Sequence, residues 1–176
     1  MNPIMRHLPL HGKFVLHAAP VDINTGGAKG GNYNGISLRN HVSITGRVVI
    51  GAHSSTAVAI TLQQMTSVEA SAAKALSFTT YYSNAYLTSP VEERDMWVEQ
   101  TASSDTFNIA ANTQYMIPIK QAMLDVTNGF DCVRLHISAP GAATIGFWEW
   151  ILFDGPTGIP GSTKHNPSVH VNRMDN

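Results

Sequence analysis

The chain has 176 residues, which suits one domain, and a chain of this length buries about 70% of its unfolded surface, enough for a hydrophobic core. Its net charge is −1, which gives no basis for binding nucleic acid, and it lacks the run of about 18 apolar residues that a membrane-spanning helix needs. Charged residues make up only 13% of the chain. A surface so poor in charge is weakly protected against association, which favours an oligomer or a component of a shell.

The chain divides into three zones. Residues 1–35 are predicted to form a loose N-terminal arm, which holds one strand-like piece at residues 13–19 and a loop rich in Gly and Asn. Residues 36–155 carry nearly all the periodic signal and are predicted to form the folded domain. Residues 156–176 contain three prolines without a period, so we expect an extended C-terminal tail.

Alternation of apolar residues with period two predicts strands throughout the central zone. Only residues 67–75 and 120–126 read as short helix, and Gly46 suggests a bulge in the first central strand. About seven or eight strands without long helices predict an all-β fold, an antiparallel β-sandwich or jelly roll. The residues expected to share a core-facing side of each strand are Val42, Ile44, Val48 and Ile50; Val58, Ile60 and Leu62; Leu76, Phe78, Thr80 and Tyr82; Phe107 and Ile109; Tyr115, Ile117 and Ile119; and Val133, Leu135 and Ile137.

The last strand, TIGFWEWILF at residues 144–153, is apolar on both faces except for Glu149. A strand with one wet face should alternate apolar and polar residues, so the second face needs a cover. A loop or the N-terminal arm is one candidate, and sugar stacking on Trp97, Trp148 or Trp150 is another. We favour burial by a neighbouring subunit, since Trp is enriched at interfaces. The expected oligomer contact is Trp148, Trp150 and Leu152.

No motif for catalysis, a cofactor or a metal stands out, so the sequence predicts a protein that is not an enzyme. His7 and His11 have helical zinc-ligand spacing, but Pro9 lies between them and breaks such a helix. GGAKGG at residues 26–31 lacks the order of a phosphate-binding P-loop and is better explained as a flexible loop. The single cysteine, Cys132, permits no intrachain disulfide and is predicted to be a buried, inert thiol.

Two pairs of acidic residues could suggest catalysis. Glu92 and Glu93 are better explained as part of a solvated loop, and Asp125 and Asp131 as residues that flank a turn. Glycoside hydrolysis would need two carboxylates facing each other across a cleft, and neither pair predicts one.

Two segments resemble small virion proteins of tailed bacteriophages. They are AVAITLQQMTSVEASAAKALSF, residues 57–78, and AANTQYMIPIKQAMLDVTNGFDCVRLHIS, residues 110–138. In the first loop this chain has Ser67 and Ala70 where that group usually has Asp and Gly. The resemblance spans roughly residues 40–155. The virion proteins that the chain resembles are mostly head-associated: capsid decoration, or cement, proteins and other structural proteins of unassigned role.

This resemblance implies a homo-oligomer, with a trimer favoured, that binds the phage major capsid protein on the capsid surface after synthesis in the bacterial cytoplasm. From the charge, the lack of a long apolar run and the lack of cofactor motifs, we expect no nucleic-acid, membrane or cofactor partner. Both ends of the chain would act as arms that contact the capsid, through Phe14, Val15, Leu16, Ile159 and Val169. The alternatives are a tail, baseplate or fibre-attachment module and a carbohydrate-binding jelly roll.

Overall fold

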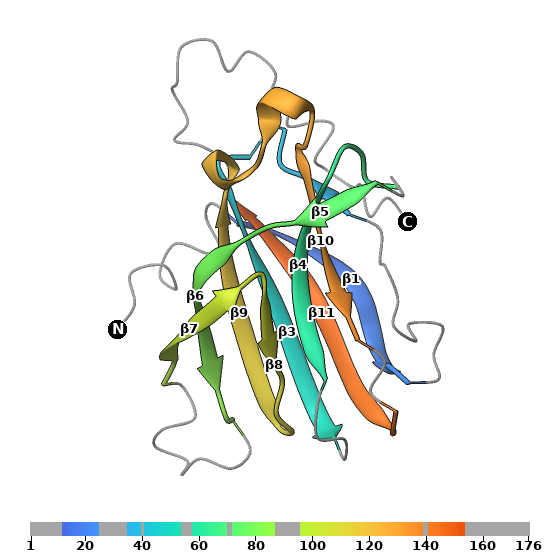
Figure 1. The fold of residues 1–176 in the computed structure, drawn as a ribbon. Coiled ribbons are helices and arrows are strands. Elements are labelled where there is room, and N and C mark those ends of the chain that lie inside the picture. The colour runs from blue at the N-terminus through green and yellow to red at the C-terminus, as the bar shows by residue number, and fades with distance from the viewer. Residues whose placement is uncertain are drawn as a thin grey trace, which may run out of the picture.

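A computed structural model describes residues 12–24, 35–39, 41–53, 58–69, 72–86, 96–138 and 141–153. Within these residues the protein is all-β, with two antiparallel sheets packed face to face as a sandwich (Figure 1). This confirms the predicted fold class. None of the helical turns in the described part of the chain is long and apolar enough to cross a membrane.

The larger sheet has six strands in the order β1-β11-β3-β9-β6-β7. Every neighbouring pair in it is antiparallel. Among the described strands, β1 and β7 are therefore the two at the edges of this sheet. The bounds are β1 (Gly12–Asp22), β11 (Thr144–Phe153), β3 (Ser43–His53), β9 (Thr113–Lys120), β6 (Phe78–Asn84) and β7 (Val98–Ser104).

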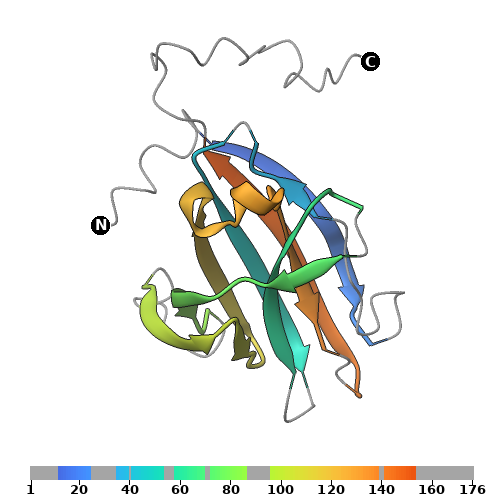
Figure 2. The same cartoon turned by 45° about the horizontal axis from the view of Figure 1, so that its top comes forward.

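The smaller sheet covers the inner face of the larger one. Its strands run in the order β2-β10-β4-β5, and β8 also pairs with β4. The 3₁₀ turns η2 (Gln121–Met123) and η3 (Val126–Asn128) connect the two sheets between β9 and β10, at one end of the sandwich (Figure 2). The strand bounds are β2 (Ile36–Ser37), β10 (Cys132–Ile137), β4 (Ala59–Met65), β5 (Ala73–Ala75) and β8 (Thr106–Asn108).

The core lies between the sheets and follows the period of two. In β3 the even-numbered residues from Ile44 to Ile50 are buried and the odd-numbered ones are half-buried. Fully burying one such aliphatic side chain contributes about 1.5–3 kcal/mol. The predicted core residues of β4, β8, β9 and β10 are buried as expected, whereas Val42, which precedes β3, is 46% exposed.

An aromatic cluster closes the sandwich where β6, β8 and β9 meet. The rings of Tyr81 and Phe107 stack with centroids 4.2 Å apart, and Tyr115 lies 5.1 Å from Phe107. The Tyr115 hydroxyl accepts a hydrogen bond from the Ala110 amide at 2.7 Å. Burial raises the pKa of Tyr115, which keeps the phenol neutral in this apolar setting. These contacts join β8 of the smaller sheet to β6 and β9 of the larger one.

Two local predictions change in the structure. Residues 73–75, expected in a short helix, form β5, because pairing with β4 outweighs the helix propensity of alanine. Gly46, expected at a bulge, lies in an unbroken register with β9 and directly opposite Trp150 of β11. The second short helix is confirmed in part, since residues 121–123 form η2.

Candidate interaction surfaces

The sequence predicted that Trp148, Trp150 and Leu152 lie on the outer face of β11, and this prediction is wrong. Trp148 and Trp150 have no exposed surface and Leu152 is 3% exposed, because all three point into the core beneath the smaller sheet. The face of β11 that carries the tryptophans is therefore covered by the same chain. These side chains have no surface to offer a second subunit, and Trp148 and Trp150 have none to offer a sugar. Trp97, the third proposed sugar platform, is half-buried next to β7.

Gly46 is the reason that an indole fits at this point. A Cβ placed on Gly46 would lie 2.9 Å from the Cζ3 atom of Trp150, closer than packed carbons approach. The glycine therefore leaves the space that the Trp150 ring fills. The pairing of Gly46 with Trp150 across neighbouring strands marks the inward face, and it becomes visible only once the strand register is known.

The outer stripe of β11 consists of Ile145, Phe147, Glu149, Ile151 and Phe153. Ile145 is 45% exposed, and Phe147 and Phe153 are half-buried. Ile151 is only 2% exposed, although it lies outside the main core cluster. The stripe is thus an apolar part of the outer face of the larger sheet, exposed mainly at Ile145 and interrupted by one acid.

Arg47 of β3 binds that acid. Its guanidinium lies 2.7 Å from a Glu149 carboxylate oxygen and donates a second bond to Gln114 at 3.1 Å. The central carbon of this guanidinium, Cζ, lies 5.9 Å from the centre of the Phe147 ring. Arg47 therefore ties β11, β3 and β9 together across the outer face and partly covers Phe147.

The predicted N-terminal contact residues lie in β1, at the edge of the larger sheet. Phe14, Val15 and Leu16 are in register with Ile151, Trp150 and Glu149, respectively. Val15 is half-buried and packs against the core. The sandwich therefore begins at Gly12 rather than at residue 36. Ile159 and Val169, the contact residues predicted in the C-terminal tail, lie outside the described residues.

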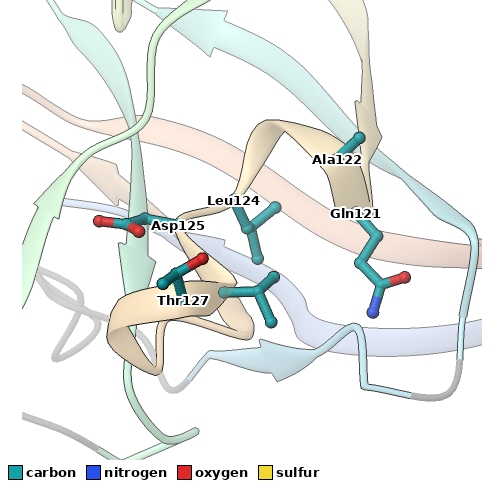
Figure 3. A pocket seen from close by; sticks show the side chains of 6 residues that line it. Gln121, Ala122, Leu124, Asp125 and Thr127 are labelled. Carbon is teal, nitrogen blue, oxygen red and sulfur yellow. The ribbon is translucent and has the colours of Figure 1, made fainter.

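A shallow depression of about 460 Å³ lies beside η2 and η3, with Gln121 and Asp125 at opposite ends (Figure 3). Asp125 forms an ion pair with Lys74, and its two carboxylate oxygens each accept a hydrogen bond from the side-chain nitrogen Nδ2 of Asn128. The bonds from Lys74 and Asn128 lower the pKa of Asp125, so the carboxylate stays ionised. Its backbone amide also donates to Gln64 at 2.8 Å, so Asp125 links η3 to the smaller sheet.

Asp131, the other member of the predicted turn pair, binds Arg39 at 2.9 Å. Across the described ranges, no group of three or more His, Cys, Asp or Glu side chains is placed to hold a metal ion.

Arg134 is a buried charge to which the sequence analysis gave no role. It lies in β10 on the outer side of the smaller sheet, is 6% exposed, and donates from Nε to Gln63 at 2.8 Å. Burial lowers the pKa of its guanidinium. The alternation of Arg134 with Val133 and Leu135 was a visible signal that it faces away from the core.

Cys132 is buried at the start of β10, with its thiol donating to Asp131 at 3.1 Å. Burial, with a further contribution from Asp131, raises the pKa of the thiol to about 11. Since the thiolate is the reactive form, we expect iodoacetamide at neutral pH to leave the folded protein unlabelled and to label it after unfolding in guanidinium. Thiol labelling followed by mass spectrometry measures this.

Thr127→Cys, on exposed η3, supplies the control, since its added thiol should react within the folded protein. Rapid labelling of Cys132 in the native state would contradict the burial described above.

These features define a β-sandwich whose larger sheet carries an exposed apolar side chain, Ile145, on its outer face. No protein-family model and no curated protein matches the chain. Among solved structures, the fold is similar to the crystal structure of the SPBc2 prophage-derived protein YomS, with a TM-score of 0.42 and 13% sequence identity. The alignment covers 80% of this chain and 92% of that one.

Proposed function

We propose that this chain is a non-enzymatic structural protein of a phage virion, which decorates the head by binding the major capsid protein. The observation that carries the proposal is the outer stripe of β11, an apolar surface in a chain with only 13% charged residues. Exposed apolar patches on soluble proteins mark sites of protein contact. The resemblance of residues 57–78 and 110–138 to phage virion proteins supports the same role.

Binding in this proposal is centred on Ile145 and Phe147. Ile145 keeps 45% of its surface exposed, and Phe147 lies beside the Arg47–Glu149 ion pair. An apolar centre bordered by an ion pair has the composition of a protein interface, where polar groups surround the buried part. A ligand that binds only the assembled head stabilises it by mass action, which is how a decoration protein would act.

The arms in this proposal are shorter than the sequence suggested. Residues 12–22 form β1 and pair with β11, so deleting them would remove an edge of the larger sheet. A deletion that tests arm binding without damaging the sandwich therefore stops at residue 11. Residues 1–11 and 154–176 are the segments that we propose to reach the capsid.

The test uses heads purified from a phage in which the gene for this chain is deleted, with the purified chain added back. We expect the chain to co-sediment with these heads, and Ile145→Asp to reduce the bound amount at least tenfold. Val126→Asp is the matched control, because Val126 is 48% exposed on η3, in the connection between β9 and β10 and outside the outer stripe. It should bind like the wild type.

Immunogold labelling of complete particles then separates the head from the tail. Label on tails or baseplates would replace decoration by the tail-module alternative. Absence of the chain from purified particles, or equal binding by Ile145→Asp and Val126→Asp, would refute the proposal. The copy number per head reports whether the bound form is the trimer that the sequence resemblance implies.

A further inference from the structure

Within the residues that the structure describes, one edge of the larger sheet is open. Strand β7 pairs with β6 on one side, and in the described part of the chain no backbone hydrogen bond reaches its other side. An edge of this kind presents a row of N–H and C=O groups that a further strand can pair with. In Figure 1, β7 lies at the side of the sheet opposite β1.

The opposite edge differs in its sequence and its geometry. Strand β1 contains Lys13 and Pro20, and its pairing with β11 is interrupted by two register shifts. Lysine, proline and bulges are the means by which sheet edges avoid pairing with other chains. Strand β7, VEQTASS, has neither lysine nor proline, and its one charge is Glu99. The protein therefore protects one edge of this sheet and leaves the other able to pair.

Exposed apolar side chains accompany the open edge. Val98 is 55% exposed and Met96, just before the strand, is 59% exposed. Val98 is in register with Ser83, which is in register with the buried Tyr115, so Val98 points to the inner side of the sheet. Its exposure means that the smaller sheet does not cover β7 there. Val98 and Met96 would gain cover if the larger sheet continued past β7.

The sequence of β7 fits a second copy of itself. In an antiparallel pair centred on Gln100, Val98 lies opposite Ala102 of the other copy, and Glu99 lies opposite Thr101. Moving the centre by one residue to Glu99 would set two carboxylates directly opposite each other, which is unfavourable. The register centred on Gln100 thus places the exposed valine against an apolar residue and keeps the like charges apart.

We propose that β7 pairs with β7 of a second copy of this chain, centred on Gln100, and forms one continuous sheet across a two-fold axis. Because each copy contributes the same strand, the contact closes on itself and gives a dimer. It uses a different part of the sheet from the outer stripe of β11, so a dimer remains able to present two such stripes. The proposal concerns the free protein and does not depend on the proposed binding to phage heads.

The first test measures mass by sedimentation equilibrium of the full chain from micromolar to millimolar concentration. We expect the wild type to approach twice the monomer mass, and Val98→Lys to weaken dimerisation at least tenfold, because lysine on an edge strand blocks pairing. Val126→Lys, with the same substitution at a similarly exposed position on η3, should dimerise like the wild type. Circular dichroism confirms that each variant is folded.

A wild type that stays monomeric throughout, or a dimer that Val98→Lys leaves unchanged, would overturn the proposal. Binding to phage heads is measured separately, so a monomer that still binds heads refutes only the β7 pairing, and a dimer that does not bind heads refutes only the proposed function.

A second test fixes the register. With Gln100→Cys the two new thiols lie opposite each other, so mild oxidation should give a disulfide-linked dimer. Glu99→Cys is the control, since its two thiols are offset along the strands and should cross-link poorly. Cys132 is buried and does not interfere. Equal cross-linking of both variants, or none with Gln100→Cys, would reject this register.

Discussion

Replacing Trp150 by alanine is expected to lower the free energy of unfolding by about 3–5 kcal/mol, the range for deleting a large buried aromatic side chain. Trp150 has no exposed surface and lies between the two sheets, opposite Gly46. Its removal leaves a cavity that neighbouring strands, held by their own hydrogen bonds, fill only in part. Urea unfolding followed by circular dichroism measures the loss.

Ile145→Ala provides the comparison within the same strand. Ile145 is 45% exposed on the outer stripe, so its truncation should change the free energy of unfolding by about 1 kcal/mol or less. A stable Trp150→Ala variant whose only change is a lower oligomeric mass would instead mean that Trp150 belongs to a subunit contact, as the sequence alone suggested.

The second large effect is expected at the residue that faces Trp150. Gly46→Ala should lower the free energy of unfolding by about 1–3 kcal/mol, because the added methyl group overlaps the indole ring. The ring is enclosed in the core and cannot move away without displacing its neighbours. The same urea titration measures this change.

Gly51 supplies the matched control, since it is also a glycine of β3. A Cβ at Gly51 would lie 3.5 Å from the Ile145 carbonyl oxygen, an ordinary contact distance. Gly51→Ala should therefore leave stability unchanged or raise it by up to about 1 kcal/mol, because alanine has less freedom in the unfolded chain. Equal losses at both positions would refute the role of Gly46 as space for Trp150.

The period of two was enough to predict the strands and the fold class, but it did not say which face of β11 turns inward. Ile145, Phe147, Ile151 and Phe153 form as apolar a set as the tryptophan face does. A side chain's face is decided by what packs above it, and for Trp150 that depends on Gly46, about a hundred residues earlier in the chain. Such a long-range match of shapes leaves no periodic trace.

The period of two also failed to predict the buried residues of β6, where the pairing with β7 is irregular. Leu76 and Phe78 are buried as predicted, but Thr80 and Tyr82 are only half-buried. The register with β7 shifts between Phe78 and Thr80, and beyond this irregularity Tyr81 packs against the core. A one-residue irregularity of this kind cannot be read from apolar spacing.

The sequence did not predict which apolar side chains of the protein are exposed. Met96, Val98 and Ile145 are each about half exposed, so some apolar surface remains outside the core. The residues chosen from the sequence, Trp148 and Trp150, were the most apolar ones, and burial in the core takes such residues first. The apolar residues that stay exposed, such as Met96, Val98 and Ile145, are smaller than tryptophan and stand out less in the sequence.

The pairing of β1 with β11 has a consequence for biosynthesis. In the sheet that it enters, β1 has β11 as its neighbour, and the two strands lie at opposite ends of the described chain, with Gly12 opposite Phe153. β11 also separates β1 from β3. On the ribosome, β1 therefore emerges long before β11 and acquires its partner in this sheet only after residues 144–153 have been synthesised.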